Sequence, residues 1–342
     1  MNHTFASDNY SGVHPEIMDA LIKANHGHAA SYGSDPYTEQ AIKRFKDFFG
    51  NDIEVFFAYN GTGANVLGLS ALTRSFEGII CSHLAHIHVD ESTASEKFIG
   101  CRQITIETVN GKITPDGIEK KIQRLGDQHH PQAKVISISQ STEYGTVYTP
   151  DEIAGIAAVA KKYGMYLHMD GSRICNAAVA QKKDFKSFTS DLGVDVLSFG
   201  GTKNGMMFGE AVIFFEKQLA KDFQYIRKQG MQLHSKMRFI AAQFDAMLSN
   251  DLWQKNAAHA NKMASLLAAE LRKISRITIT KSVDANGVFA IMPPEIIPSL
   301  QEHQYFYVWN EELNEVRLMC SFNTSEKNVE DFVQKIKELL EE

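Results

Sequence analysis

Hydrophobic and polar positions alternate with two different periods along the first two-thirds of the chain. Short apolar runs predict strands at residues 55–59, 78–82, 103–107, 135–139, 166–169, 194–199 and 211–215. Apolar residues recur every three or four positions, as in amphipathic helices, over residues 15–25, 37–49, 64–72, 114–125 and 150–163. Buried strands separated by helices are typical of an α/β fold, in which helices cover both faces of a mostly parallel sheet.

The pattern changes after residue 215. Residues 216–248 are almost continuously helical in pattern, with one interruption at Gly230, and residues 251–274 predict a second long helix. Four short strands and a closing helix follow, at residues 277–280, 288–292, 305–309, 316–320 and 327–340. We therefore predict two domains: residues 1–250 form an N-terminal arm and a large α/β domain, and residues 251–342 form a small α+β domain.

Composition narrows the classes of function. The chain has 342 residues, which is long for a single core. A net charge of −6 gives no general attraction to nucleic acid, and no apolar run is long enough to predict a membrane span. The N-terminus lacks the pattern of a secretory signal, so we expect a cytoplasmic protein. Its four cysteines are widely spaced, which favours buried thiols over a metal site or a disulfide framework.

Candidate chemistry lies where predicted strands end, because open α/β sheets bind ligands at the carboxyl ends of their strands. The first strand leads into Gly61, Thr62 and Gly63 at the start of a helix, where backbone N–H groups bind phosphate. The spacing does not match a dinucleotide fingerprint, because Val66 replaces the last glycine or alanine, and it does not match a P-loop. An ordinary glycine-rich turn is the structural alternative.

Asp170 and Lys203 follow two apolar strands that are neighbours in sequence. A carboxylate at the end of a buried strand needs a cation or strong hydrogen bonds, so Asp170 either pairs with Arg173 or binds a protonated ring nitrogen. Lys203 lies between glycines that let a planar group approach the backbone. A partly buried lysine tends to lose its charge and become nucleophilic. Together, the two side chains favour covalent chemistry at Lys203 over a solvated lysine.

Two motifs carry a family resemblance, His168 to Arg173 and Ser198 to Gly205. Further matching segments are Ser7 to Gly12, Ser31 to Pro36, Asn60 to Gly63, Ala85 to Glu91 and Val316 to Leu318. Over nearly its whole length the chain resembles the pyridoxal 5'-phosphate (PLP) enzymes of fold type I, and within them the threonine aldolase branch of the β-eliminating lyases. Residues 139–143 differ from the Glu-Asn-Thr-His pattern of well-known members, which indicates the low-specificity or phenylserine-type subgroup.

The resemblance implies how the cofactor is held. Lys203 would bind PLP covalently, Asp170 would pair with the pyridine nitrogen, and His86 would stack on the ring. Gly61, Thr62 and Gly63 would hold the phosphate, and Arg173 would lie beside the cofactor. A polar strand end shared with its neighbouring histidines is the alternative for His86.

The resemblance also implies the substrate site. Arg173, Arg317 and Ser7 would bind the substrate carboxylate, and Tyr32 would line the site near the substrate or a neighbouring subunit. His129 resembles a second histidine near the substrate hydroxyl, and His130 is equally available for that role. Ser7 has a simple capping role as its alternative. Arg317 lies in an apolar strand, where an inward arginine needs an anion, either a substrate carboxylate or a structural partner.

The implied reaction is retro-aldol cleavage of L-threonine or L-allo-threonine to glycine and acetaldehyde by a homodimer or homotetramer. His86, His129 or an ordered water would accept the proton of the β-hydroxyl. Other PLP reactions on the same fold remain open, namely β-elimination, transamination and desulfuration. Desulfuration requires a mobile cysteine, and Cys175 and Cys320 lie in or beside apolar segments, which is unsuited to that role. A PLP-fold module that binds a ligand without turnover is the alternative from another class.

Overall fold

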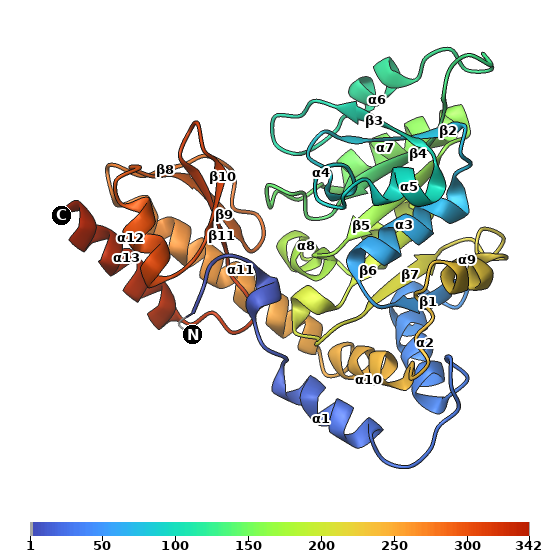
Figure 1. Cartoon of the computed structure of the whole chain (residues 1–342), viewed down its shortest axis with the longest axis horizontal. Helices are drawn as coiled ribbons and strands as arrows, with labels where there is room; N and C mark the ends of the chain where they lie inside the picture. Colours follow the sequence, from blue (N-terminus) through green and yellow to red (C-terminus); the bar gives the residue numbers. More distant parts are fainter. Residues whose placement is uncertain (1–2, 342) are drawn as a thin grey trace.

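The computed structural model describes residues 3–341 and contains two sheets (Figure 1). The larger sheet has seven strands in the order β1-β7-β6-β5-β4-β2-β3. From one edge to the other these are Glu54–Ala58, Glu210–Phe214, Val196–Gly200, Tyr166–Gly171, Gln132–Ser139, Glu77–Ser82 and Arg102–Ile106. Strand β7 pairs antiparallel with both β1 and β6, and the other neighbouring strands pair in parallel. The prediction of a mostly parallel sheet is therefore confirmed.

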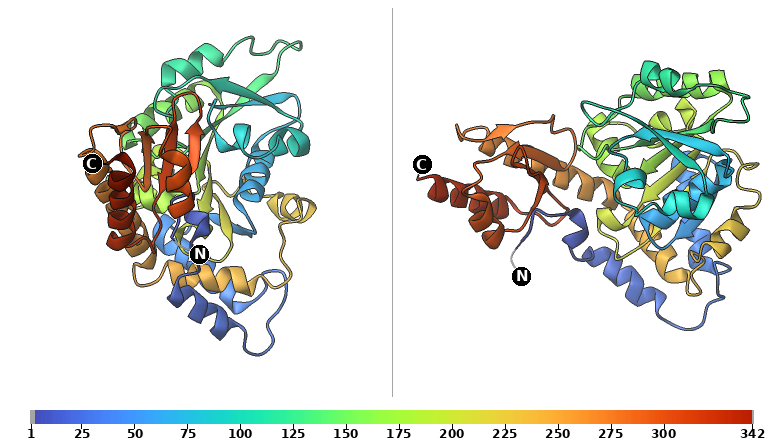
Figure 2. Two further views of the ribbon diagram at one scale, coloured as in Figure 1. Left: turned by 60° about the vertical axis from the view of Figure 1, so that its left-hand side comes forward. Right: turned by 45° about the horizontal axis from the view of Figure 1, so that its top comes forward.

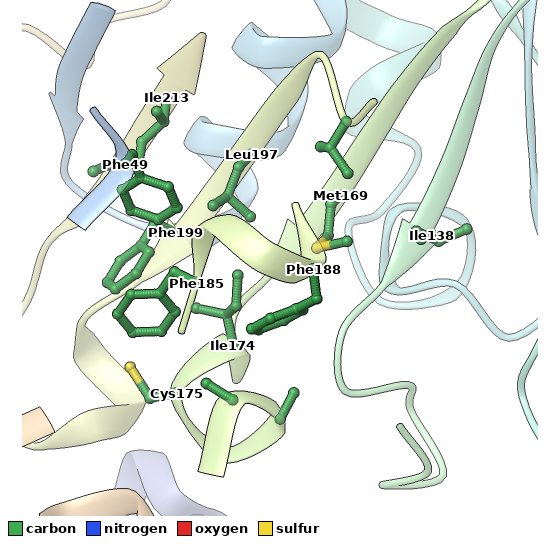
Figure 3. Packing of buried hydrophobic residues seen from close by; sticks show 14 of the residues in the cluster. Phe49, Ile138, Met169, Ile174, Cys175, Phe185, Phe188, Leu197, Phe199 and Ile213 are labelled. Carbon is green, nitrogen blue, oxygen red and sulfur yellow. The ribbon is translucent and has the colours of Figure 1, made fainter. Parts of the chain in front are cut away.

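Both faces of this sheet are buried. In β7, Ala211 and Ile213 belong to one hydrophobic core, whereas Val212 and Phe214 belong to the core on the opposite face. The first core holds a cluster of aromatic rings around Phe199, which meets Phe185 at 5.2 Å between ring centroids (Figure 3). Burial of strand side chains on both faces explains why these strands are continuous apolar runs in the sequence.

Helices cover the two faces of the sheet (Figures 1 and 2). The residues of the larger core come from α1, α2, α6, α7, α8 and α10, which are Pro15–Ala24, Pro36–Phe49, Pro115–Lys121, Pro150–Tyr163, Ile174–Gln181 and Arg238–Met247. The opposite face is covered by α3, α4, α5 and α9, which are Gly61–Leu72, His86–Val89, Ala94–Ile99 and Phe223–Gln229. Within residues 3–341, no helix combines the length and the apolar character that crossing a membrane requires.

The smaller sheet is antiparallel and lies at the opposite end of the molecule from β1 to β7 (Figures 1 and 2). Its strands follow the order β10-β11-β9-β8, which are Tyr307–Asn310, Glu315–Met319, Gly287–Ile291 and Thr278–Ile279. The helices α11 (Leu252–Leu271), α12 (Ile297–His303) and α13 (Glu326–Leu340) pack with it around the second core. This arrangement matches the α+β character that we predict for the C-terminal part.

Two features connect the two parts of the molecule. The first turns of α11 contribute Leu252 and Trp253 to the core of the large sheet, whereas Met263 and later residues belong to the core of the small sheet. The N-terminal arm also reaches the small sheet, because Phe5 lies in its core and accepts a hydrogen bond from the Met319 N–H at 2.7 Å. The predicted division near residue 250 falls just before α11, the helix that joins the two cores.

The helical segments differ from the prediction in three places. Residues 216–248 form two short helices, α9 and α10: Gly230 is the C-cap of α9, at a position where a Cβ would meet the Leu67 side chain, and α10 begins only at Arg238. The helix predicted to end at residue 125 ends at Lys121, and Arg124 follows with a φ of +52°. The short helices α4, α5, α8 and α12 were not predicted, because fewer than nine residues give too few periodic positions.

Candidate active site

The candidate site is a pocket at the carboxyl ends of the parallel strands. Asp170 pairs in register with Ser139 of β4 and Ser198 of β6, and β6 leads into the 3-10 turn Thr202–Asn204 that carries Lys203. The pocket lining includes Gly61, Thr62, His86 and Lys203 together with Asn65, Glu91, Ser172 and Glu210. The structure therefore brings the principal predicted cofactor residues to one edge of the sheet.

Asp170 is held as an anion directly behind the pocket lining, where it bonds to the lining residues Asn65 and Ser172. Its Oδ1 accepts hydrogen bonds from the Ser172 N–H at 2.9 Å and the Ser172 hydroxyl at 2.6 Å, and its Oδ2 accepts one from the Asn65 amide at 2.8 Å. Burial alone would raise the pKa of Asp170, but the hydrogen bonds from Ser172 and the charges of Lys203 and His86 hold it below its ordinary value. A buried, negatively charged carboxylate is suited to pair with a protonated ring nitrogen.

Lys203 is half-buried in the 3-10 turn Thr202–Asn204, where it lines the pocket. Burial and the neighbouring positive charge of Arg173 lower the pKa of Lys203, which favours the neutral, nucleophilic amine. The Gly201 N–H donates to Glu210 Oε2 at 2.9 Å, and burial raises the pKa of Glu210 to about 7. A Cβ at Gly200 would lie 2.3 Å from the Ser172 carbonyl oxygen, so only glycine permits this close approach before the lysine.

The predicted phosphate cradle lies at the start of α3. Asn60 is the N-cap of this helix, and its Oδ1 accepts a hydrogen bond from the Gly63 N–H at 2.8 Å. Gly61 and Thr62 line the pocket at the positive end of the helix dipole, where a phosphate is stabilised. Gly63 differs from the prediction, because its N–H is already bonded to Asn60 and its Cα faces Gln232.

His86 begins α4 and lies between two buried acids. Its Nδ1 is 2.8 Å from Glu91 Oε1, and its backbone N–H donates to Glu143 Oε1 at 3.0 Å. The hydrogen bond with Glu91 raises the pKa of His86, against the lowering effect of burial. The acid Glu143 follows β4 in the segment that departs from the family pattern, and burial raises its pKa. The imidazole is thus oriented through Nδ1 and lines the pocket.

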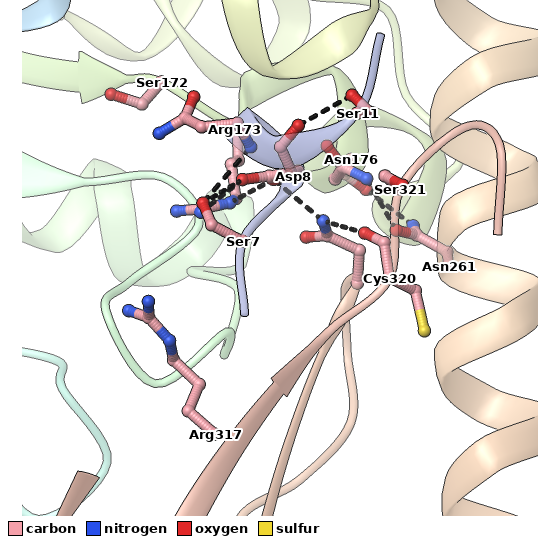
Figure 4. Close-up of polar contacts among 12 residues, drawn as sticks. Ser7, Asp8, Ser11, Ser172, Arg173, Asn176, Asn261, Arg317, Cys320 and Ser321 are labelled. Atoms are coloured by element: carbon pink, nitrogen blue, oxygen red, sulfur yellow. Dashed lines mark hydrogen bonds and ion pairs between the residues drawn. The ribbon is translucent and has the colours of Figure 1, made fainter. Parts of the chain in front are cut away.

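The predicted carboxylate-binding residues lie near the N-terminal arm (Figure 4). Arg173 forms a bidentate pair with Asp8, with distances of 2.7 Å from Nε to Oδ2 and 2.8 Å from Nη2 to Oδ1. The sequence had offered Asp170 as the ionic partner of Arg173, but the fold supplies Asp8 from 165 residues away. Ser7 caps the short turn of the arm by accepting a hydrogen bond from the Asn9 N–H at 3.2 Å.

Arg317 has unfilled hydrogen-bonding capacity. Its guanidinium packs 5.0 Å from the Trp309 ring and 5.6 Å from the Tyr307 ring, and Nη2 makes a long 3.4 Å contact with the Ala6 carbonyl. Its Nε is buried and has no hydrogen-bond partner among residues 3–341. Burial lowers the pKa of Arg317 to about 10. A buried arginine with free donors is a binding point for a carboxylate.

His129 and Tyr32 lie apart from the other predicted site residues of their own chain. His129 lies in the loop before β4, at the edge of the sheet opposite to Asp170, and its N–H donates to Asp127 at 2.9 Å. Tyr32 is 51% exposed, and the Lys228 amine lies 5.1 Å from the centre of its ring. Within a single chain the length of β4 separates His129 from Asp170, so the role of His129 beside the substrate stays a prediction.

Several residues of the site were missed in the sequence. Asn65 and Glu210 line the pocket, and Asp8 orients Arg173. Asn65 follows Gly61 by four residues, so both lie on one face of the helix, and this spacing is the sequence signal that Asn65 belongs to the site. Glu210 carries no local signal, because its proximity to Thr202 depends on the antiparallel pairing of β6 with β7.

The donor set fits PLP. The pocket combines a half-buried lysine of lowered pKa, a carboxylate held as an anion and a helix N-terminus, which suit an aldehyde, a ring nitrogen and a phosphate respectively. His86 adds a flat aromatic side chain to the same pocket. The residues that would hold PLP are therefore Lys203, Asp170, His86, Gly61 and Thr62.

Comparisons with known proteins agree with this assignment. Residues 4–293 match the family model described as beta-eliminating lyase. The low specificity L-threonine aldolase of Pseudomonas sp. (strain NCIMB 10558) is 42% identical over 98% of this chain and 97% of its own, and that of Pseudomonas aeruginosa is 43% identical over 98% of each.

Solved structures extend the comparison. The threonine aldolase of Leishmania major superimposes with a TM-score of 0.94 at 30% identity, covering 99% of this chain and all of its own. An aspartate aminotransferase of Thermus thermophilus has a TM-score of 0.73 at 16% identity, covering 96% of this chain and 89% of its own, so it supports the fold alone. The chain is therefore a PLP-dependent lyase of fold type I that belongs to the beta-eliminating lyase family, in its threonine aldolase branch.

Proposed function

We propose that this enzyme cleaves β-hydroxy-α-amino acids between Cα and Cβ, converting L-threonine or L-allo-threonine to glycine and acetaldehyde. The observation that carries the proposal is that Lys203 and His86 line one pocket and Asp170 is bonded to its lining, while Arg317 has an Nε that is unbonded among the described residues, on the side of Arg173 and Asp8. The high identity to low specificity L-threonine aldolases supports the same substrate class.

The residues of the chain divide the chemistry among them. PLP, when bound, accepts the electrons of the broken bond, and the protein supplies orientation and charge. Lys203 attaches the cofactor, and Asp170 keeps the proton on the ring nitrogen. Arg317 and Ser7 bind the substrate carboxylate, together with the Arg173 nitrogen Nη1 that is not bonded to Asp8. Binding of the carboxylate orients the bond to be broken. His86 accepts the β-hydroxyl proton, and its bond with Glu91 stabilises the imidazolium that forms.

We propose that a second copy of the chain completes part of the predicted site. Neither Tyr32 nor His129 is among the residues that line the pocket of its own chain. We propose a homodimer or homotetramer in the cytoplasm, in which these two side chains approach the pocket of another subunit. Sedimentation analysis of the holoenzyme tests the assembly, and a purely monomeric active enzyme would exclude this role for both residues.

The direct test is an acetaldehyde assay with L-threonine and L-allo-threonine. We expect acetaldehyde from the wild-type holoenzyme, and no turnover above background from Lys203→Ala. A substrate panel separates the other reactions: pyruvate or keto acid without aldehyde would indicate β-elimination or transamination. A spectral change on ligand binding without any product would indicate a binding module instead.

A further inference from the structure

Asn65 connects two carboxylates of the pocket. It is 1% exposed on α3, and its single amide nitrogen donates to Asp170 Oδ2 at 2.8 Å and to Glu91 Oε1 at 3.0 Å. An amide NH2 has two hydrogens, so these two bonds use its whole donor capacity. An aspartate or a leucine of similar size cannot make both bonds, and an aspartate would add a third negative charge.

Glu91 continues this connection to the imidazole of His86. The Glu91 side chain has no exposed surface, and Oε1 accepts from Asn65 while lying 2.8 Å from His86 Nδ1. Its Oε2 is buried without a hydrogen-bond partner among the described residues. Burying a carboxylate in this way costs free energy unless an opposite charge lies beside it, and His86 is the adjacent group that can supply that charge.

We infer that Asn65 and Glu91 are positioning residues that link Asp170 to His86 through one continuous chain of hydrogen bonds. Glu91 fixes Nδ1 as the bonded nitrogen, so that Nε2 is the nitrogen left for the substrate or cofactor. Asn65 donates to the carboxylates of both Asp170 and Glu91 and so fixes their positions relative to each other. The kinetic consequence of this link rests on the proposed function, whereas its effect on the titration of His86 does not.

Three ionisable groups act on the His86 ring, and a fourth bonds its backbone. Glu91 lies beside it on the same segment, Asp170 faces it from β5, and Lys203 faces it from the turn after β6, while Glu143 bonds its backbone N–H. The bond with Glu91 is the largest cause of the raised pKa of His86. Replacing Glu91 by glutamine removes the negative charge and retains the shape, so the imidazolium becomes less stable and the pKa of His86 falls.

The test is a pH titration of His86 in the holoenzyme, labelled with 15N-histidine and assigned by the signal missing from His86→Gln. We expect Glu91→Gln to move the His86 titration to lower pH, and Glu91→Asp, which keeps the charge, to restore part of that shift. We also expect kcat with L-allo-threonine to fall roughly ten- to a hundredfold, as for a lost hydrogen bond to a charged group, with a smaller change in KM.

A matched control removes a different buried carboxylate. Glu315 of β11 is 4% exposed and lies in the small sheet, so Glu315→Gln should leave the His86 titration unchanged. Asn65→Ala is the second variant: it should shift the His86 titration and also the pH dependence of the PLP absorbance, because both carboxylates lose their link.

The outcomes are distinguishable. An unchanged His86 titration in both Glu91→Gln and Asn65→Ala overturns the inference, whatever happens to turnover. A His86 titration shift in Glu315→Gln as large as that in Glu91→Gln also overturns the inference, because the shift would then not depend on the hydrogen bond to Glu91. If the shifts occur as expected but the wild-type enzyme forms no acetaldehyde, the proposed function fails and the hydrogen-bonded link stands.

Discussion

The buried pair between Asp8 and Arg173 is expected to hold the N-terminal arm across the two parts of the molecule. Asp8 is 1% exposed, and besides its two bonds to Arg173 it accepts a bond from the Asn286 amide at 3.0 Å. Arg173 follows β5 of the large sheet, whereas Asn286 precedes β9 of the small sheet. The change Asp8→Asn removes the charge and one strong acceptor while preserving size.

The magnitude follows from the burial of the partner. Removing one member of a buried ion pair costs about 3–5 kcal/mol, because the other charge is left uncompensated. The Arg173 side chain retains 16% exposure, and asparagine keeps one acceptor, so we expect the lower end, about 3 kcal/mol. Urea unfolding, followed by fluorescence of Trp253 in α11 and Trp309 in β10, measures the loss in both parts of the chain.

The same pair predicts a pH dependence. Burial raises the pKa of Asp8, but the charges of Arg173 and Lys203, together with the hydrogen bonds from Arg173 and Asn286, outweigh it and hold the pKa below its ordinary value. Its stabilising contribution is therefore present above the ordinary pKa of an aspartate and is lost as the pH falls through the lowered one. Asp127→Asn, which removes an exposed pair with Arg124, is the control and should change stability little. A loss below about 1 kcal/mol for Asp8→Asn would refute the reasoning, since that is the size of a surface pair.

Three further predictions concern the pocket and its support. Burial lowers the pKa of His168 to about 4, so the unfolded chain takes up a proton at a higher pH than the folded one. As the pH falls from 6.5 to 4, the wild type should therefore lose about 3 kcal/mol more stability than His168→Gln, as measured by urea unfolding. Gly200→Ala should lower stability by about 1–3 kcal/mol and disturb the pocket, because the added Cβ would clash with the Ser172 backbone. Gly61→Ala is the control: its added Cβ would have no atom within 4 Å, so this variant should fold normally. Asp170→Asn should lower kcat by about a hundredfold or more and weaken PLP binding, which steady-state kinetics and a PLP titration measure.

The sequence predicted the central part of the site because that part depends on local features. Asp170 and Lys203 each follow a continuous apolar strand, and the parallel direction of β5 and β6 brings both strand ends to the same edge. Gly61 and Thr62 begin a helix directly after a strand, which is the local geometry of an anion site. Strand position therefore places these four residues at one edge of the sheet, and the family resemblance supplies their predicted roles.

The remaining features depend on contacts between distant segments. Asp8 and Arg173 are 165 residues apart, so no local pattern could identify Asp8 as the partner of Arg173. His129 was predicted from its place before a strand, yet a residue before a parallel strand lies at the edge of the sheet away from the pocket. The interruption at Gly230 was predicted, but not that residues 231–237 would be non-helical, because their own pattern is helical.

The most direct test of the account is to identify the residue that carries PLP. The holoenzyme is reduced with borohydride, which makes the linkage between the cofactor and its amine permanent, and the digested protein is mapped by mass spectrometry. We predict that the cofactor is found on the peptide containing Lys203, and that it is absent from this position in Lys203→Ala. Label on a different lysine, or no label on PLP-saturated protein, would contradict the assignment of the active site.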